Sequence, residues 1–282
     1  MKNAKEFEKM INSSPKTGNS LIIPIGYSGE VIKELSLSCR GKIRDRYGNI
    51  SNGSINGYAV FCGIKEEGEN LISGLMLNLC KKYLPSEALL SYYNVSDIPC
   101  KAFDFLQYLP NVDKICQSAV GERLETEIEV LKSEYEARYR QIDRYADCYA
   151  RAVNSVQKDV EGLGLPQKVL VFRIPYSRYD YRVKNQLEKH IHFLTQELWR
   201  VGIYPIVLFA DDSADSDFGS LAYYLGCNVI LSSSRRARDK YEEMKSGEAL
   251  VYNAEGSETF SIPHYDGRWI SEAISSLAER GK

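Results

Sequence analysis

The sequence predicts an α/β fold, with a mostly parallel, Rossmann-like sheet flanked by helices in the C-terminal part of the chain. Short apolar runs rich in strand-forming residues alternate there with segments whose apolar residues recur every three or four positions. The stretch Gly162-Leu163-Gly164-Leu165-Pro166 precedes these segments and is typical of a linker, which predicts a separate domain over residues 166–282. Because such alternation favours right-handed crossovers, we expect the strands at 168–174, 206–210 and 228–231 to be parallel and adjacent.

The elements of this domain are read from their length and periodicity. Four strands are expected, at Lys168–Ile174, Ile206–Ala210, Asn228–Leu231 and Ala249–Tyr252, and the last turns into a hairpin with Thr259–Ile262. Four helices are expected, at Tyr181–Arg200, Phe218–Leu225, Arg235–Lys245 and Arg268–Arg280. Strand, loop, helix and strand over 206–234 make a βαβ unit, and in such sheets ligands bind at the carboxyl ends of the strands.

The N-terminal part predicts a mobile polar arm over residues 1–19 and an α+β domain over 20–118. Pro24 predicts that the strand Ser20–Tyr27 lies at a sheet edge, since proline has no N–H to donate to a neighbouring strand. Asn-Gly dipeptides within 42–63 indicate hairpin turns, with Tyr58–Phe61 as the returning strand. An amphipathic helix is expected over Asn70–Tyr83, and shorter helical stretches near 87–93 and 101–109.

A single long helix is predicted over residues 122–161, within a segment that runs from 119 to 163. The stretch has no glycine or proline before Gly162, and its apolar residues step by three or four with one extra four-residue step at Tyr135–Tyr139. Two interpretations stay open: a coiled coil that makes a homo-oligomer through 122–161, or a helix packed along its own protein.

Composition excludes several function classes. The net charge of −2 and isoelectric point near 6.0 give no overall basic field, which argues against non-specific nucleic-acid binding as the main task but leaves a local patch open. No apolar run is long enough to span a bilayer and the first residues lack a signal core, so a cytoplasmic protein without a membrane partner is expected. The seven scattered cysteines predict neither a zinc site nor disulfides. No Walker loop is present, which argues against an ATPase of that class.

Three polar loops follow the predicted parallel strands and converge on one rim of the sheet. Arginines beside aromatic residues suit an anionic ligand, and helix N-termini at the rim favour phosphate. The alternative is that loops are polar simply because they lie at the surface. The predicted ligand-binding residues are Tyr176, Arg178, Asp180 and Arg182 in the first loop, Ser213, Asp215, Asp217, Gly219 and Ser220 in the second, and Ser234, Arg235 and Arg236 in the third.

Asp211 and Asp212 are the predicted catalytic pair. They end an apolar strand, so their backbone is anchored while their side chains reach the rim. Two adjacent carboxylates repel unless a cation compensates, and a pair of this kind can orient ribose hydroxyls or hold Mg²⁺, the one cofactor that the sequence suggests. The alternative is that Asp212 caps the helix that follows.

Short stretches near this pair resemble three enzyme families. IVLFADD with its small-residue loop is similar to the ribose-phosphate loop of phosphoribosyltransferases; Asp211 and Asp212 match the acidic pair there, and Gly219 and Ser220 the phosphate turn. SDFGS resembles the Asp-Ser-Gly-Thr turn of nucleoside deoxyribosyltransferases, although no glutamate nucleophile follows. Asp215-Ser216-Asp217 is similar to the metal-binding Asp-x-Asp of nucleotide-sugar glycosyltransferases. All three resemblances imply an anionic ligand that carries ribose or a sugar phosphate.

Two function classes follow from these observations. The first is an enzyme that binds a nucleotide or sugar phosphate at the carboxyl edge of the C-terminal sheet, with glycosyl or phosphoribosyl transfer as its reaction. In that case Asp211 and Asp212 orient the sugar or Mg²⁺, and the arginines hold phosphate. The second is a non-catalytic interaction or assembly protein that oligomerises through the long helix.

Overall fold

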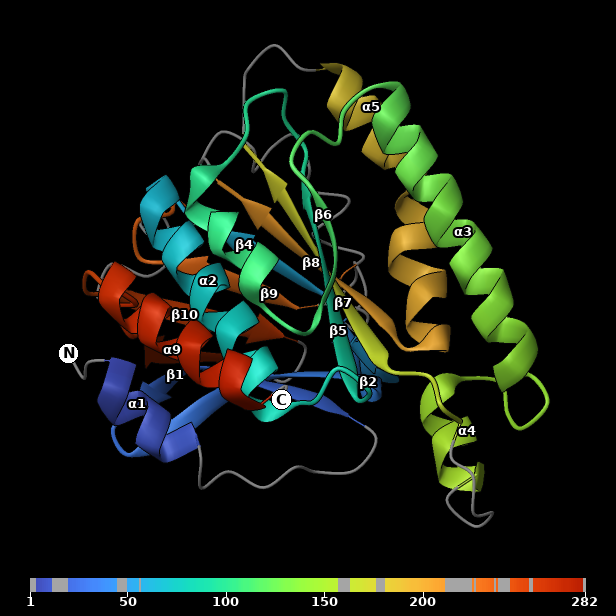
Figure 1. Cartoon of the computed structure of the whole chain (residues 1–282), viewed down its shortest axis with the longest axis horizontal. Helices are drawn as coiled ribbons and strands as arrows, with labels where there is room; N and C mark the ends of the chain where they lie inside the picture. Colours follow the sequence, from blue (N-terminus) through green and yellow to red (C-terminus); the bar gives the residue numbers. More distant parts are fainter. Residues whose placement is uncertain are drawn as a thin grey trace.

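Six parallel strands form the centre of the fold, in the spatial order β9-β4-β8-β7-β5-β6 (Figure 1). The computed structural model describes residues 4–11, 20–44, 50–55, 57–156, 163–175, 181–210, 225, 227–235, 237, 244–253 and 256–280. The strands are β4 (Tyr58–Phe61), β5 (Ala88–Asn94), β6 (Val112–Cys116), β7 (Gln167–Ile174), β8 (Ile203–Phe209) and β9 (Asn228–Leu231). The predicted α/β class with a parallel sheet is thus confirmed.

The order of the parallel strands differs from the prediction at one place. β7 and β8 are parallel neighbours as expected, but β4 lies between β8 and β9 and is parallel to both. β4 is therefore not the returning strand of a hairpin. Its four residues are all buried, which suits a central strand covered on both faces. As a consequence, the sheet joins strands from both sides of the predicted linker.

Antiparallel strands extend the sheet beyond β9, and the eleven strands that the described residues form all belong to one sheet. They are β10 (Glu248–Asn253), β11 (Gly256–Ser261), β1 (Leu21–Ser28), β2 (Val31–Arg44) and β3 (Ile50–Ile55). The predicted hairpin of β10 and β11 is confirmed. β1 is not an edge strand, because it pairs with β2 and β11. A register shift between Pro24 and Gly26 accommodates the proline within the sheet.

Tyrosine hydroxyls complete the backbone hydrogen bonding where these outer strands leave the parallel block. Tyr83 Oη accepts from Ile22 N at 2.9 Å and donates to Ile22 O at 3.1 Å. Tyr58 Oη makes the same pair of bonds with Ser36 N and O, at 3.1 and 3.2 Å. Each hydroxyl thus satisfies two backbone groups, which accounts for part of the high tyrosine content.

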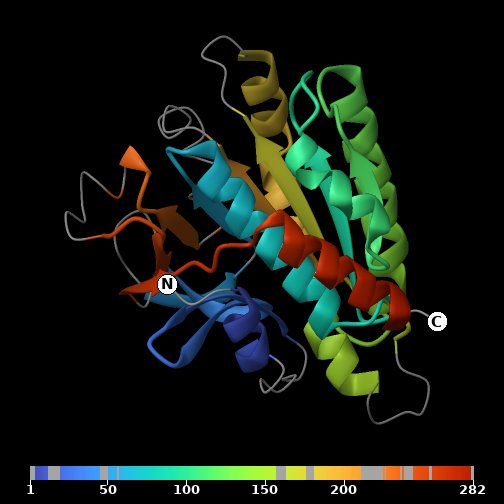
Figure 2. The ribbon, with the colours of Figure 1, turned by 60° about the vertical axis from the view of Figure 1, so that its left-hand side comes forward.

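Helices cover both faces of the sheet (Figures 1 and 2). One face carries α1 (Ala4–Ile11), α2 (Lys65–Lys82), the 3-10 helix η1 (Lys101–Tyr108) and α9 (Gly267–Arg280). The other carries α3 (Glu122–Ile142), α4 (Tyr149–Val156), α5 (Tyr181–Lys189), the π-helical turn η2 (Phe193–Glu197) and the 3-10 turn η3 (Leu198–Val201). Successive strand residues supply the two cores, because their side chains alternate between faces: Val169 and Val171 face α2, whereas Leu170 and Phe172 face α3.

The predicted long helix is two helices. α3 ends at Ile142, the chain turns through 143–148, and α4 starts at Tyr149. Tertiary contacts account for the break: Tyr149 Oη donates to Leu165 O at 2.6 Å, and its ring lies against Gly202, where a Cβ would approach it to 2.8 Å. Residues 157–161 lie outside the described part of the chain.

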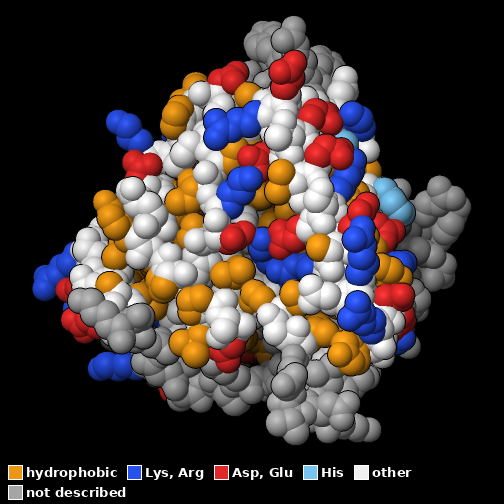
Figure 3. Space-filling view, turned by 45° about the vertical axis from the view of Figure 1, so that its right-hand side comes forward, with side chains coloured by type: hydrophobic (Ala, Val, Ile, Leu, Met, Phe, Trp, Pro, Cys, Tyr) orange, Lys and Arg blue, Asp and Glu red, His pale blue; other side chains and the backbone are white. Residues whose placement is uncertain are grey.

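The apolar side of α3 packs against its own sheet. Leu124, Ile128 and Leu131 are at most 2% exposed within the core that includes β7 and β8. The face of the molecule that carries α3 shows acidic and basic side chains intermixed (Figure 3). The helix packed along its own protein, one of the two alternatives, is therefore the arrangement observed within the chain.

Two N-terminal predictions were also wrong. Residues 88–94 form β5 and not a helix, because Leu90 and Tyr92 face one core while Tyr93 faces the other, the two-residue period of a strand. Residues 4–11, predicted to lie in a mobile arm, form α1. Phe7 of α1 is fully buried beside Tyr27, and Lys81 is within hydrogen-bond distance of Glu8.

Gly74 should be the helix glycine least tolerant of a side chain. A Cβ at Gly74 of α2 would lie 1.9 Å from the ring of Tyr265, which precedes α9. We expect Gly74→Ala to lower the free energy of unfolding by about 1–3 kcal/mol through overpacking. Gly267→Ala is the matched control, because no atom of the described residues lies within 4 Å of a Cβ there. Urea denaturation tests both variants, and equal stabilities would show that α2 and Tyr265 are not packed this closely.

Candidate functional site

Two of the three predicted rim loops start side by side. β7 and β8 are neighbours, and Ala210 N donates to Ile174 O at 3.1 Å, so the chain leaves both strands at the same point of the rim. The residues after these strands lie outside the described part of the chain: Asp211, Asp212, Ser213, Asp215, Asp217, Gly219 and Ser220 in one loop, and Tyr176, Arg178 and Asp180 in the other. Arg182 belongs to α5, but its side chain is not described.

The third predicted loop follows β9 and is separated from β8 by β4. Ser234 is buried, at 2% exposed, and its N–H donates to Leu231 O at 2.9 Å, so it belongs to the turn that ends the strand. Arg235 is exposed, and Arg236 lies outside the described residues. The neighbouring Ser233, which was not predicted, makes the contact that matters at this rim.

Ser233 occupies the turn between β4 and α2. Its Oγ accepts from Gly63 N at 3.1 Å and from Ile64 N at 3.2 Å. These two N–H groups precede the first turn of α2, whose positive dipole end would otherwise attract an anion. Only residues 62–64 separate the strand from the helix, and Gly68 N already donates to Ile64 O at 3.4 Å. The turn is therefore closed by the protein itself.

A buried ion pair lies directly behind this turn. Glu69 of α2 is 8% exposed and Arg173, near the end of β7, is 5% exposed. Arg173 donates to the same carboxylate oxygen, Glu69 Oε1, from Nε at 3.0 Å and from Nη2 at 2.8 Å. The pair crosses from the helix layer to the sheet and joins residues 104 positions apart in the sequence.

Polar residues on β5 and its following loop complete the environment of this pair. Arg173 Nη1 donates to Asn94 Oδ1 at 3.1 Å, and Asn94 Nδ2 donates to the carbonyls of Ile98 and Gln117 at 2.7 and 2.9 Å. Cys100 Sγ lies 3.4 Å from Glu69 Oε1. Burial raises the pKa of Cys100, and Glu69 raises it further against the opposing effect of Arg173, so the thiol is the donor in this contact.

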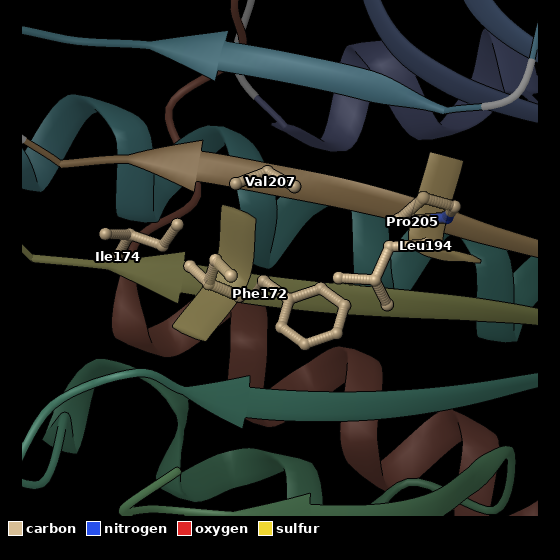
Figure 4. Close-up of a pocket in the computed structure, with 6 residues that line it drawn as sticks. Phe172, Ile174, Leu194, Pro205 and Val207 are labelled. Atoms are coloured by element: carbon tan, nitrogen blue, oxygen red, sulfur yellow. The ribbon is translucent and has the colours of Figure 1, made fainter. Parts of the chain in front are cut away.

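Beside the start of α2 lies an open hollow of about 240 Å³, lined by Glu66, Glu67, Asn70, Ser246, Gly247, Ile262, Pro263 and His264. Two of these residues are acidic and belong to the first turn of the helix. A cavity of about 10 Å³ lies between β7, β8 and the helical segment above them (Figure 4). Its lining is wholly apolar: Phe172, Ile174, Leu187, Leu194, Pro205 and Val207. A site this small and apolar does not hold even an ordered water. Among the described residues no three His, Cys, Asp or Glu side chains are grouped to hold a metal ion. None of the helices described is long and apolar enough to cross a membrane.

No protein-family model and no curated protein matches the sequence. Solved structures do match the fold. The cytoplasmic domain of the type VII secretion ATPase EccC of Thermomonospora curvata superposes with a TM-score of 0.68 at 14% identity, over 94% of this chain and 32% of that one. This chain shares its fold with part of that protein.

Two further ATPase-fold structures agree. ATPases 2 and 3 of EssC from Geobacillus thermodenitrificans give a TM-score of 0.63 at 14% identity, over 95% of this chain and 50% of that one. The conjugation coupling protein TcpA of pCW3, with ATPγS, gives 0.60 at 12% identity, over 100% of this chain and 88% of that one. This chain spans a third to a half of the first two proteins.

The segment that contains Glu69 can be compared with the phosphate-binding motif of Walker-type ATPases. Walker-type ATPases connect a strand to a helix through Gly-x-x-x-x-Gly-Lys-Ser/Thr, whose lysine reaches the phosphates. Here β4 is followed by Gly63-Ile64-Lys65-Glu66-Glu67-Gly68-Glu69-Asn70, so both glycines keep their spacing. Glu69 stands in place of the lysine and Asn70 in place of the hydroxyl residue. In those enzymes an aspartate helps to hold Mg²⁺, whereas the strand residue that reaches this helix is Arg173.

The sequence did not predict this site, because Glu69 and Asn70 replace the lysine and the hydroxyl residue that complete the motif. The available signal was the pair Gly63 and Gly68, five apart, directly after a short apolar strand and before an amphipathic helix. Asn70 also has a structural role: its Nδ2 donates to Pro263 O at 3.0 Å and its Oδ1 accepts from Tyr265 N at 2.9 Å. Helix α2 thus fixes the segment that leads into α9.

The ion pair should behave as a coupled unit. Removing one partner leaves a buried charge uncompensated, so Arg173→Met and Glu69→Met should each lower the free energy of unfolding by about 3–5 kcal/mol. Replacing both by methionine should restore most of that loss, since neither charge then remains.

A double-mutant cycle by urea denaturation measures this coupling. The surface pair Arg268–Glu272, with side chains 83% and 44% exposed, is the control, and Arg268→Met should change stability by less than about 1 kcal/mol. Additive losses at Glu69 and Arg173 would contradict a direct buried pair.

Proposed function

We propose that this chain is a non-hydrolysing domain of the ATPase fold, with an interaction or assembly role in place of catalysis. The observation that carries the proposal is the ion pair of Glu69 with Arg173 at the point where a Walker-type ATPase places its phosphate-binding lysine. This choice corresponds to the second function class of the sequence analysis, without a coiled coil as its basis.

Electrostatics support the absence of phosphate binding at the β4–α2 turn. A nucleoside triphosphate at the β4–α2 turn would approach the carboxylates of Glu66, Glu67 and Glu69 in the first turns of α2. Like charges repel, and the buried guanidinium of Arg173, which could attract the phosphates, is already paired with Glu69. The phosphate would also have to displace Ser233 from the N–H groups of Gly63 and Ile64.

The similar proteins suggest the setting of such a domain. The EssC structure comprises ATPases 2 and 3, and this chain covers half of it. We propose that this chain acts beside domains of the same fold, where a rigid domain without nucleotide-dependent change holds neighbours in place.

Purified full-length chain should neither hydrolyse ATP nor gain stability from it. We expect no phosphate release above a buffer blank, and no rise in melting temperature with ATP, ADP or ATPγS plus Mg²⁺. A ligand present at a hundredfold over its Kd would stabilise the protein by roughly 2.7 kcal/mol, which thermal unfolding detects readily. Two results would contradict the proposal. One is saturable stabilisation by ATP that persists in Asp211→Asn and Asp212→Asn; the other is ATP hydrolysis that Glu69→Gln abolishes.

A small anionic ligand at the rim is the second candidate. The adjacency of β7 and β8 favours it, since the loops with Arg178 and with Asp211 and Asp212 start at one point. A nucleotide or sugar phosphate would then be held by the arginine, with Mg²⁺ or a ribose on the acidic pair, and group transfer would be the reaction.

Substitution of the acidic pair separates the two candidates. If the rim binds a sugar phosphate, a panel of nucleotides and sugar phosphates with Mg²⁺ should contain a compound that raises the melting temperature of the wild type. Asp211→Asn and Asp212→Asn should each abolish that rise and leave the apo melting temperature unchanged, because asparagine is a good helix cap like aspartate. Equal responses in all three proteins would exclude the pair as the site.

A further inference from the structure

We propose that Arg173 is the centre of an oxyanion-binding site that the chain occupies with its own Glu69 carboxylate. The inference deepens the proposed function, because a site filled from within cannot respond to nucleotide. It assigns to this site a ligand class, small oxyanions such as carboxylates and phosphate, and to Glu69 the role of its internal ligand.

The geometry is that of a ligand site. Two guanidinium donors of Arg173, Nε at 3.0 Å and Nη2 at 2.8 Å, converge on the single atom Glu69 Oε1, and the Cys100 thiol adds a third contact at 3.4 Å. A guanidinium edge with two parallel N–H groups is the fork that binds carboxylate and phosphate. The Glu69 oxygen thus takes the place of an anion oxygen.

The Arg173 side chain is held in place by contacts other than the one with Glu69. Arg173 Nη1 is bound to Asn94 Oδ1, and Asn94 is fixed in turn by two backbone carbonyls, of Ile98 and Gln117. The backbone of Arg173 belongs to β7, which is paired on both sides. Removing the Glu69 side chain therefore leaves the donors aimed at the vacated position, which is the preorganisation that a binding site needs.

Charge supplies the driving force for an external ligand. Glu69 is the one carboxylate in ion-pair contact with Arg173 among the residues that the structure describes. Without it a guanidinium that is 95% buried has no counter-ion, and a small anion in the vacated position restores neutrality. The Glu69 side chain is 10% exposed, so the position that it would vacate borders solvent.

Chemical rescue tests the proposal. Glu69→Ala is titrated with sodium formate and with inorganic phosphate at constant ionic strength held by sodium chloride, and unfolding is followed by circular dichroism. We expect the melting temperature of Glu69→Ala to rise saturably with either oxyanion towards that of the wild type. Wild type and the double variant Glu69→Ala/Arg173→Met, tested in parallel, should show no such rise.

The other outcomes of this titration also support or overturn the oxyanion site. A Glu69→Ala protein that folds only when formate or phosphate is present also supports the site. A variant that stays unfolded at every anion concentration overturns it, as does a rise of equal size in the double variant. None of these outcomes depends on whether the wild type binds ATP, so failure here is distinct from failure of the proposed function.

Discussion

The buried ion pair between Glu69 and Arg173 is the interaction on which the functional interpretation depends. It joins α2, which lies on one face of the sheet, to β7 in the middle of the parallel block, and Asn94 extends the contact to β5. A buried pair is weak evidence for net stability, because two charges must be desolvated, but breaking it on one side is costly. The pair therefore fixes one arrangement of the site more than it strengthens the fold.

Under the proposed function, the same ion pair takes the place of a phosphate-binding site. The strand, the two glycines and the helix are present, yet a carboxylate stands where phosphate needs a cation, and a guanidinium stands opposite it. The N–H groups at the helix start are bound by Ser233. Fold alone does not set function. Here two side chains, Glu69 and Arg173, set the charge of the site, and the neutral Ser233 accepts from its N–H groups.

Local patterns made much of the fold predictable, and long-range pairing made the rest inaccessible. The strands at 168–174 and 228–231, the β10–β11 hairpin and α9 follow from apolar runs and turn residues. The insertion of β4 between β8 and β9 does not, because a four-residue apolar strand has the same pattern in a hairpin and in a parallel sheet. The end of α3 at Ile142 depends on contacts of Tyr149 with Gly202. Glu69 and Arg173 lie 104 positions apart in the sequence and meet only after folding.

A crystal structure of this chain grown with ATPγS and Mg²⁺ would show directly whether Glu69 and Ser233 exclude nucleotide phosphate. We expect Glu69 within hydrogen-bond distance of Arg173, and Ser233 Oγ accepting from the N–H groups of Gly63 and Ile64. We expect no nucleotide at the start of α2. Nucleotide phosphates at that turn, with Glu69 rotated away from Arg173, would contradict the proposed function.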